Sequence, residues 1–363
     1  MKTVRFTGKE KRDREFVMHL RKEVNDYFKQ NNISTKSNAA MIFKTVAMLS
    51  IYIVPFIVML VVPLPFWAAL LCWFTMGVGI AGVGMGIMHD ANHGAYSKHN
   101  WVNNVLSGTM YLLGANVLNW KIQHNVLHHT YTNIAGLDED IDSKGPIRLS
   151  ENMPLKPYHR FQYIYAFFFY GFMTLSMYVN DFKRLAKYKE AGLLQAQSKS
   201  IGSEFVKMLV RKIAYAVVAI GLPIVLAHYS VVEVLTGFFL MQFVASIILS
   251  FVFQMAHVVE GAEQYCEAPE MSVEWHVHQL YTTSDFARNS PILSWYVGGL
   301  NYQIEHHLFP SICHVHYKAL APIVQRVAEQ YGIPYNLKKG FATALSSHVR
   351  RLKELGMQYV PST

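Results

Sequence analysis

The stretch FWAALLCWFTMGVGIAGVGMGIMHDANH, residues 66–93, joins a long apolar run directly to two histidines. The run from Phe66 to Met88 can cross the hydrocarbon core of a bilayer as a helix, because such a helix needs about 20 mostly apolar residues. His89 and His93 follow it, and residues four apart lie on one face of an α-helix. The stretch therefore predicts a membrane-spanning helix that continues into a pair of histidines facing the same side.

The composition of the whole chain agrees with a membrane protein. Of its 363 residues, 52% are hydrophobic and only 16% are charged, whereas about 25% are charged in a typical soluble domain. Four apolar runs are long enough to span a bilayer. The expected spans are roughly residues 42–62, 66–88, 212–228 and 231–256. We therefore predict an all-α integral membrane fold with four transmembrane helices in two hairpins.

The distribution of Lys and Arg predicts the orientation of these spans. The turns VPLP (62–65) and HYS (228–230) contain neither residue, whereas the N-terminal arm and residues 183–212 are rich in both. By the positive-inside rule the turns lie outside and both termini lie in the cytoplasm, which in a bacterium means that the protein sits in the inner membrane. The net charge of +9 fits this membrane face better than a nucleic-acid surface.

The segments outside the spans are expected to form a helical cytoplasmic cap. The chain would then be one domain, residues 1–363, with the cap built from residues 1–41, 89–211 and 257–363. The aromatic run 161–179 within the cap has basic residues on both sides. If it crossed the membrane fully, one of these basic segments would lie on the outer side. We expect it to lie in the membrane interface, with a spanning helix as the alternative.

Three histidine clusters fall on the predicted cytoplasmic side. They are HDANH (His89, His93), HNVLHH (His124, His128, His129) and QIEHH (Gln303, His306, His307). Adjacent residues on a helix point about 100° apart, so an H-x-x-x-H-H run suits two metal centres rather than one. Imidazole binds iron, copper, nickel and zinc, and seven histidines exceed the four ligands of one tetrahedral zinc. The clusters therefore predict a site for two metal ions, held by the cap.

The three clusters resemble the histidine boxes of integral-membrane fatty acid desaturases, and the resemblance extends from the first hairpin through NYQIEHHLFP. Gln303, at the first position of the third box, is similar to the front-end group, which inserts a double bond between an existing one and the carboxyl end. The resemblance implies two iron ions, O2 as co-substrate, and a fatty acyl substrate carried as a CoA thioester or a lipid. It also implies His257, at the end of the fourth span, as an eighth ligand.

Electrons are expected from an external donor, such as a ferredoxin or a small b-type cytochrome, because the chain has no HPGG haem motif. Four polar side chains are candidates to bind or support the metals. Asp90 and Glu305 would either orient the imidazoles of their neighbours or be solvated acids, and Gln254 would hold a metal-bound water or orient His257. Whether Gln303 binds metal through its amide oxygen, through water or not at all stays open.

Other polar and aromatic segments receive less specific interpretations. DEDID (138–142) lacks calcium-loop spacing and is expected to be a solvated loop or a donor-docking surface. The stretches 274–286 and 289–302 could line an acyl tunnel or pack within the cap. Alternating histidines are poor ligand pairs on a helix, so four are excluded as ligands. These are His276, His278, His314 and His316.

Two other functions compete with desaturation. A histidine-box hydroxylase or alkane monooxygenase would use the same metal centre and differ in its product. A metal transporter is disfavoured, because its histidines would lie at mid-membrane depth, whereas these cluster at span ends and in the cap. Chain length, bond position, acyl carrier and oligomeric state are not encoded in any motif of the sequence.

The orientation can be tested with reporter tags at residue 1, near residue 195 and at residue 363. All three should report a cytoplasmic location, because the basic segments flank them. An external signal from the tag near residue 195 would place the second and third histidine clusters on opposite faces of the membrane and exclude a shared site.

Overall fold

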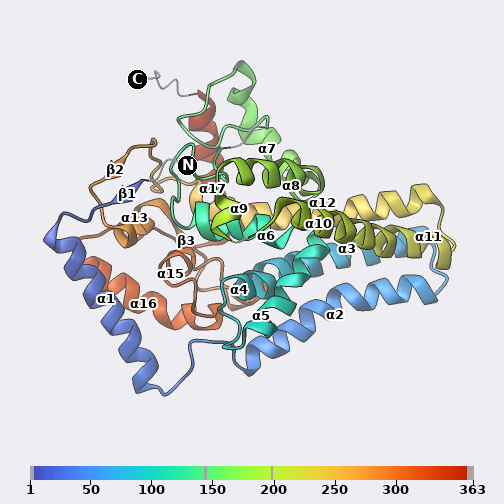
Figure 1. The fold of residues 1–363 in the computed structure, drawn as a ribbon, viewed down its shortest axis with the longest axis horizontal. Coiled ribbons are helices and arrows are strands. Elements are labelled where there is room, and N and C mark those ends of the chain that lie inside the picture. Colours follow the sequence, from blue (N-terminus) through green and yellow to red (C-terminus); the bar gives the residue numbers. More distant parts are fainter. Residues whose placement is uncertain (1–3, 143–144, 198, 358–363) are drawn as a thin grey trace.

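The computed structural model describes residues 4–142, 145–197 and 199–357, which leaves the two terminal tag positions outside the described residues. Four helices among them are long and apolar enough to span a membrane, as predicted. They run over Ala39–Val61, Phe66–Asn92, Ile201–Leu226 and Val231–His257. Figure 1 shows them extending to one side, with the shorter helices gathered on the other.

The spans and their continuations comprise the following helices. These are α2 (Ala39–Val61), α3 (Phe66–Gly82), the π-helix η1 (Val83–Met88), α4 (His89–Asn92), α10 (Ile201–Ala216), the π-helix η5 (Val217–Gly221), α11 (Leu222–Leu226) and α12 (Val231–His257). The third span starts 11 residues earlier than the predicted 212, because helix α10 continues N-terminally through an amphipathic segment. Lys212, expected at the cap boundary, therefore lies inside the helix, where its Nζ pairs with Asp181 Oδ2 at 2.9 Å.

Close packing of small against large side chains holds the bundle together. Trp73 of α3 is buried against α12, where a Cβ added to Gly237 would lie 2.1 Å from the indole. Met76 and Ile80 of α3 and Met241 of α12 extend this contact as part of one apolar cluster. The outer faces carry exposed apolar residues suited to lipid. Examples are Val61, Trp67, Leu71 and Val232.

The remaining described elements form the cap. They are β1 (Arg5–Phe6), α1 (Lys11–Gln30), α5 (Asn100–Ser107), η2 (Gly108–Leu113), α6 (Val117–Trp120), the π-helix η3 (Lys121–His128), η4 (Pro157–Phe161), α7 (Gln162–Tyr170), α8 (Met173–Glu190), α9 (Leu193–Ala196), β2 (Glu270–Met271), α13 (Trp275–Thr282), β3 (Asp285–Phe286), α14 (Pro291–Tyr296), α15 (Gln303–Leu308), η6 (His314–His316), α16 (Tyr317–Gln330), β4 (Leu337–Lys338) and α17 (Phe341–Met357).

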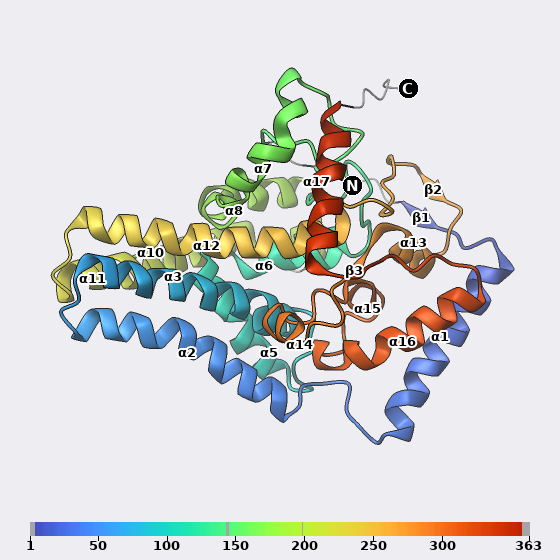
Figure 2. The ribbon, with the colours of Figure 1, turned by 180° about the vertical axis from the view of Figure 1, so that it is seen from behind.

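Apolar faces and two short strand pairs join these segments. Helix α1 packs along α16 through Phe16, Leu20, Leu320 and Val324, and both views show the two helices side by side (Figures 1 and 2). Strand β1 pairs in parallel with β2, and β3 pairs in parallel with β4. The cap is therefore tied together by segments far apart in the sequence.

The aromatic run 161–179 is interrupted. Helix α7 ends at Tyr170 and α8 begins at Met173, so neither helix appears among the four span-length apolar helices of the described residues. Ile164 and Phe168 on α7 are exposed. This exposed aromatic face suits the membrane interface, and the interfacial placement stays a prediction.

The cap meets the second span at η1, the π-helical turn before His89. Gly298, with φ +66°, approaches so closely that an added Cβ would lie 2.5 Å from the Met85 carbonyl oxygen and 2.6 Å from Gly86 Cα. Gly332 has a similar φ of +64°, but nothing lies within 4 Å of its added Cβ. Comparing the same substitution at the two glycines therefore distinguishes the cost of backbone strain from the cost of steric contact.

We expect Gly298→Ala to lower the thermal denaturation temperature in detergent more than Gly332→Ala. Both changes carry the left-handed backbone cost of about 1–2 kcal/mol, but only the first forces the cap away from η1. Equal destabilisation of the two variants would show that the cap does not depend on this contact.

Candidate metal centre

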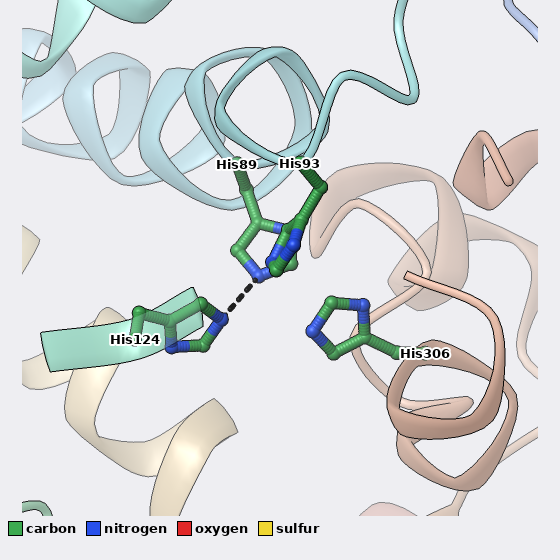
Figure 3. Close-up of side chains that lie close together, drawn as sticks. All are labelled: His89, His93, His124 and His306. Carbon is green, nitrogen blue, oxygen red and sulfur yellow. Dashed lines mark hydrogen bonds between the residues drawn. The ribbon is translucent and has the colours of Figure 1, made fainter. Parts of the chain in front are cut away.

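The eight histidines predicted as ligands meet at the ends of the spans. They lie on α4, η3, α12 and α15 and the residues directly following α4 and η3. All but His93 are buried, and His93 is half-buried. Figure 3 shows four of these rings pointing toward a common centre.

The first group consists of His89, His93, His124 and His306. One ring nitrogen from each lies within 4.8 Å of the others. The Nε2 atoms of His89 and His124 are 3.1 Å apart, as the dashed line in Figure 3 marks. This group draws on all three histidine clusters, so their shared site is a feature of the fold.

The second group consists of His128, His257 and His307, again with ligand atoms within 4.8 Å of one another. His129 lies between the two groups. Its Nε2 is 3.2 Å from Nε2 of His124 in the first group. Its ligand nitrogen also lies within 4.8 Å of those of His306 in the first group and His307 in the second. The two groups are therefore neighbours, as expected for a two-metal site.

The second cluster keeps the α-helical pairing of His124 with His128, whose ring centroids are 5.3 Å apart, and adds a contact of His129 with His124. Regular α-helical spacing would place His124 and His128 together and turn His129 away. Segment η3 is a π-helix, and the His129 N–H donates to the His124 carbonyl five residues earlier, at 2.9 Å. His129 therefore follows His124, and His128 turns toward the second group.

The nitrogen positions fit metal ions. Two imidazole nitrogens bound to one metal at 2.0–2.1 Å stand about 3.0–3.4 Å apart for octahedral or tetrahedral angles, close to the N···N separations seen here. Nε2 of His93 and Nε2 of His128 are buried without a hydrogen-bond partner. Buried nitrogens without partners are unfavourable unless something binds them.

Five of the rings have the protonation state that metal binding requires. Burial lowers the pKa of His93, His124, His129, His306 and His307 well below its ordinary value, and the neighbouring histidines lower it further. These imidazoles are therefore neutral at pH 7, each with a lone pair for a metal.

Two side chains that sequence reasoning did not assign orient the second group. His128 Nδ1 donates to Asp138 Oδ2 at 3.0 Å, and His307 Nδ1 donates to Gln279 Oε1 at 2.8 Å. Burial alone would lower the pKa of His128, but Asp138 and Asp140 outweigh it and raise the pKa. Occupying Nδ1 leaves Nε2 facing the group, which is how supporting residues usually orient a ligating histidine.

The expectation of a solvated or donor-docking DEDID loop is wrong for its first residue. Asp138 is 0% exposed. Besides His128, its carboxylate accepts the backbone N–H groups of Asn133 and Asp140. The loop after the second cluster folds back on the ligand helix. The sequence shows an acidic residue ten positions after His128. Helix periodicity does not predict a contact between residues that far apart.

The other supporting side chains are placed differently than expected. Asp90 Oδ1 is 4.0 Å from His89 Nδ1, beyond hydrogen-bond reach, and Asp90 Oδ2 accepts from His314 instead. Glu305 accepts from the Tyr335 hydroxyl at 2.8 Å, and burial together with Asp285 raises its pKa well above the ordinary value. The reason is geometric, because adjacent residues on a helix do not face each other.

Gln303 and Gln254 lie close to the second group. The Gln303 amide nitrogen is 3.0 Å from Nε2 of His257 and 3.4 Å from Nε2 of His307. Gln254 is buried, and its Oε1 has no hydrogen-bond partner. Their contribution to metal binding stays a prediction.

A cavity of about 770 Å³ opens beside the histidines. Its inner wall is mainly apolar and includes Met85, Leu113 and Phe253, while His89, His124 and Gln303 also line it. Lys183, Arg184, Lys187 and Glu139 line it as well. Of the two aromatic stretches predicted to line a tunnel or to pack within the cap, only 289–302 reaches this cavity among its lining residues, through Leu300.

Comparison with known proteins agrees with this architecture. The family model described as fatty acid desaturase matches residues 64–339. The chain is 36% identical to the sn-1 linoleoyl-lipid 6-desaturase of Arthrospira platensis, over 94% of this chain and 93% of that protein. It is 32% identical to the sn-1 linoleoyl-lipid 6-desaturase of Synechocystis sp., over 97% and 98%. It is 34% identical to an acyl-lipid (8-3)-desaturase of Physcomitrium patens, over 98% and 74%.

The metal centre can be tested by comparing His257→Ala with His278→Ala in purified protein. His278 is also buried, but its Nε2 donates to the Thr132 carbonyl at 2.8 Å, and it belongs to neither group. We expect His257→Ala to lose metal from the second group and His278→Ala to keep it. Metal content per chain is the measurement, and full retention in folded His257→Ala would exclude His257 as a ligand.

Proposed function

Because this chain belongs to the fatty acid desaturase family, we propose that it inserts a cis double bond into the acyl chain of a membrane lipid at a histidine-held pair of iron ions. That it is a membrane enzyme that uses metal and O2 to desaturate fatty acyl chains follows from the family. The proposal concerns the identity of the metal, the acyl carrier and the position of the new bond.

The apolar cavity beside His89, His124 and Gln303 carries the proposal. A saturated acyl segment has no polar handle, so apolar walls must hold it against the reacting centre. Iron, when bound, would activate O2, which is the oxidant that removes two hydrogens from unactivated carbons. The burial of the ligands excludes bulk water from that step.

The residues around the cavity have separable roles. The first group, His89, His93, His124 and His306, would hold one iron, and the second group would hold the other, with His129 between them. Asp138 and Gln279 hold the His128 and His307 rings, each by its Nδ1–H. The Gln303 amide would complete the second group at the edge of the cavity.

A front-end position and a lipid carrier are supported by Gln303 and by the relatives. The relatives from Arthrospira platensis and Synechocystis sp. are named as linoleoyl-lipid 6-desaturases, and others are named as acyl-lipid (8-3)-desaturases. We therefore favour a lipid over a CoA thioester as the carrier, and a new bond toward the carboxyl end.

Removing two hydrogens and reducing O2 to two waters requires two electrons and two protons from outside the substrate. We propose that a ferredoxin or a small b-type cytochrome supplies the electrons, with the site and both termini in the cytoplasm. The basic residues beside the spans support this orientation.

Expression in a host that lacks polyunsaturated lipids, with linoleate supplied, tests the function. Fatty acid profiles should show a product lacking two hydrogens, with the new bond on the carboxyl side of the existing ones. His307→Ala should give none. A product that gains an oxygen atom instead would identify a hydroxylase and contradict the proposal.

A further inference from the structure

A buried lysine lies near the start of the first span. Lys44 of α2 is only 2% exposed. Ionisable side chains inside membrane helices carry a free-energy cost and usually have a function. The Lys44 Nζ is 2.8 Å from Nε2 of His314, which belongs to η6 in the cap. The first span and the C-terminal part of the cap therefore meet through a polar contact.

His314 continues this contact to the first histidine cluster. Its Nδ1 is 2.8 Å from Asp90 Oδ2, and its backbone N–H donates to the same oxygen at 3.2 Å. An ammonium group can only donate, so Nε2 of His314 accepts from Lys44 and Nδ1–H donates to Asp90. The ring thus bridges a buried cation and a buried carboxylate.

The chain around this bridge leaves room for it. A Cβ added to Gly86 would lie 3.3 Å from Cε and 3.4 Å from Nζ of Lys44, so the absence of a side chain lets the ammonium pass over η1. The Nζ also lies 5.8 Å from the centre of the Trp295 ring. The bridge therefore crosses the π-helical turn that directly precedes His89.

We propose that Lys44, His314 and Asp90 are positioning residues that hold the helix end carrying His89 and His93 for the first metal group. This inference rests on the metal centre proposed above. Moving α4 away from its place would leave Asp90 or Lys44 buried and unpaired, which is strongly unfavourable. The buried charges therefore hold α4 in one position. His89 and His93 need this fixed position to bind a metal ion together with the other histidines.

The test uses cobalt(II) binding to the metal-free protein in detergent, followed by absorption, so that it does not depend on activity. Lys44→Met keeps the length of the side chain and removes its charge. We expect the affinity of one of the two cobalt sites to fall by about 10–100-fold, the usual effect of losing a supporting residue. Lys44→Arg, which keeps a cationic donor, should restore most of the affinity.

Two further variants separate positioning from general stability. Lys212→Met breaks a partly buried ion pair between α10 and α8, and neither helix carries a predicted ligand. It should lower the denaturation temperature but leave both cobalt affinities unchanged. The double variant Lys44→Met with Asp90→Asn removes both charges. Its denaturation temperature should therefore be higher than that of Lys44→Met alone, while its cobalt affinity stays low.

Wild-type affinity of both cobalt sites in Lys44→Met would overturn the inference, and so would an equal loss of affinity in Lys212→Met. Failure of the proposed function looks different. In that case the unmodified protein itself would bind fewer than two metal ions and form no unsaturated product.

Discussion

The close approach of buried imidazole nitrogens is the constraint on which the rest of the structure depends. A neutral imidazole has one N–H and one lone pair, and away from water both need partners. Asp138 and Gln279 each take an N–H on the outer side, at His128 and His307. The inward nitrogens meet one another at about 3 Å, a spacing that neighbouring ligands of one metal ion also have.

The membrane bundle places this site where its substrate can reach it. The spans Phe66–Asn92 and Val231–His257 carry His89 and His257 near their ends. The two spans pack against each other at Trp73 and Gly237 and again at Gly77 and Met241. The cap brings the other ligands from η3 and α15 to the same level. An acyl chain is soluble in the bilayer, and the cavity beside the histidines lies at the border of bundle and cap, with residues of both in its wall.

Local departures from regular helix geometry adjust the ligand directions. The π-helical turn η1 precedes His89, and η3 contains His124 and His128. π-helical turns are rare and are frequently found at functional sites. In η3 the wider turn aligns His129 with His124. One short segment can then supply histidines to both groups. The sequence predicted two groups, but not how the histidines of this segment divide between them.

The sequence by itself determined the four spans, from apolar run length, and the family resemblance, from the three histidine clusters. Residue type and spacing also predicted seven of the eight histidines that meet, and the resemblance added His257. The sequence did not determine which side chains support the ligands. Asp90 reaches His314, 224 residues away, and Glu305 reaches Tyr335. Asp138, expected in water, lies under His128. Only the tertiary structure decided these contacts, because helix periodicity sets the direction of each side chain, whereas the folding of the loops sets what it meets there.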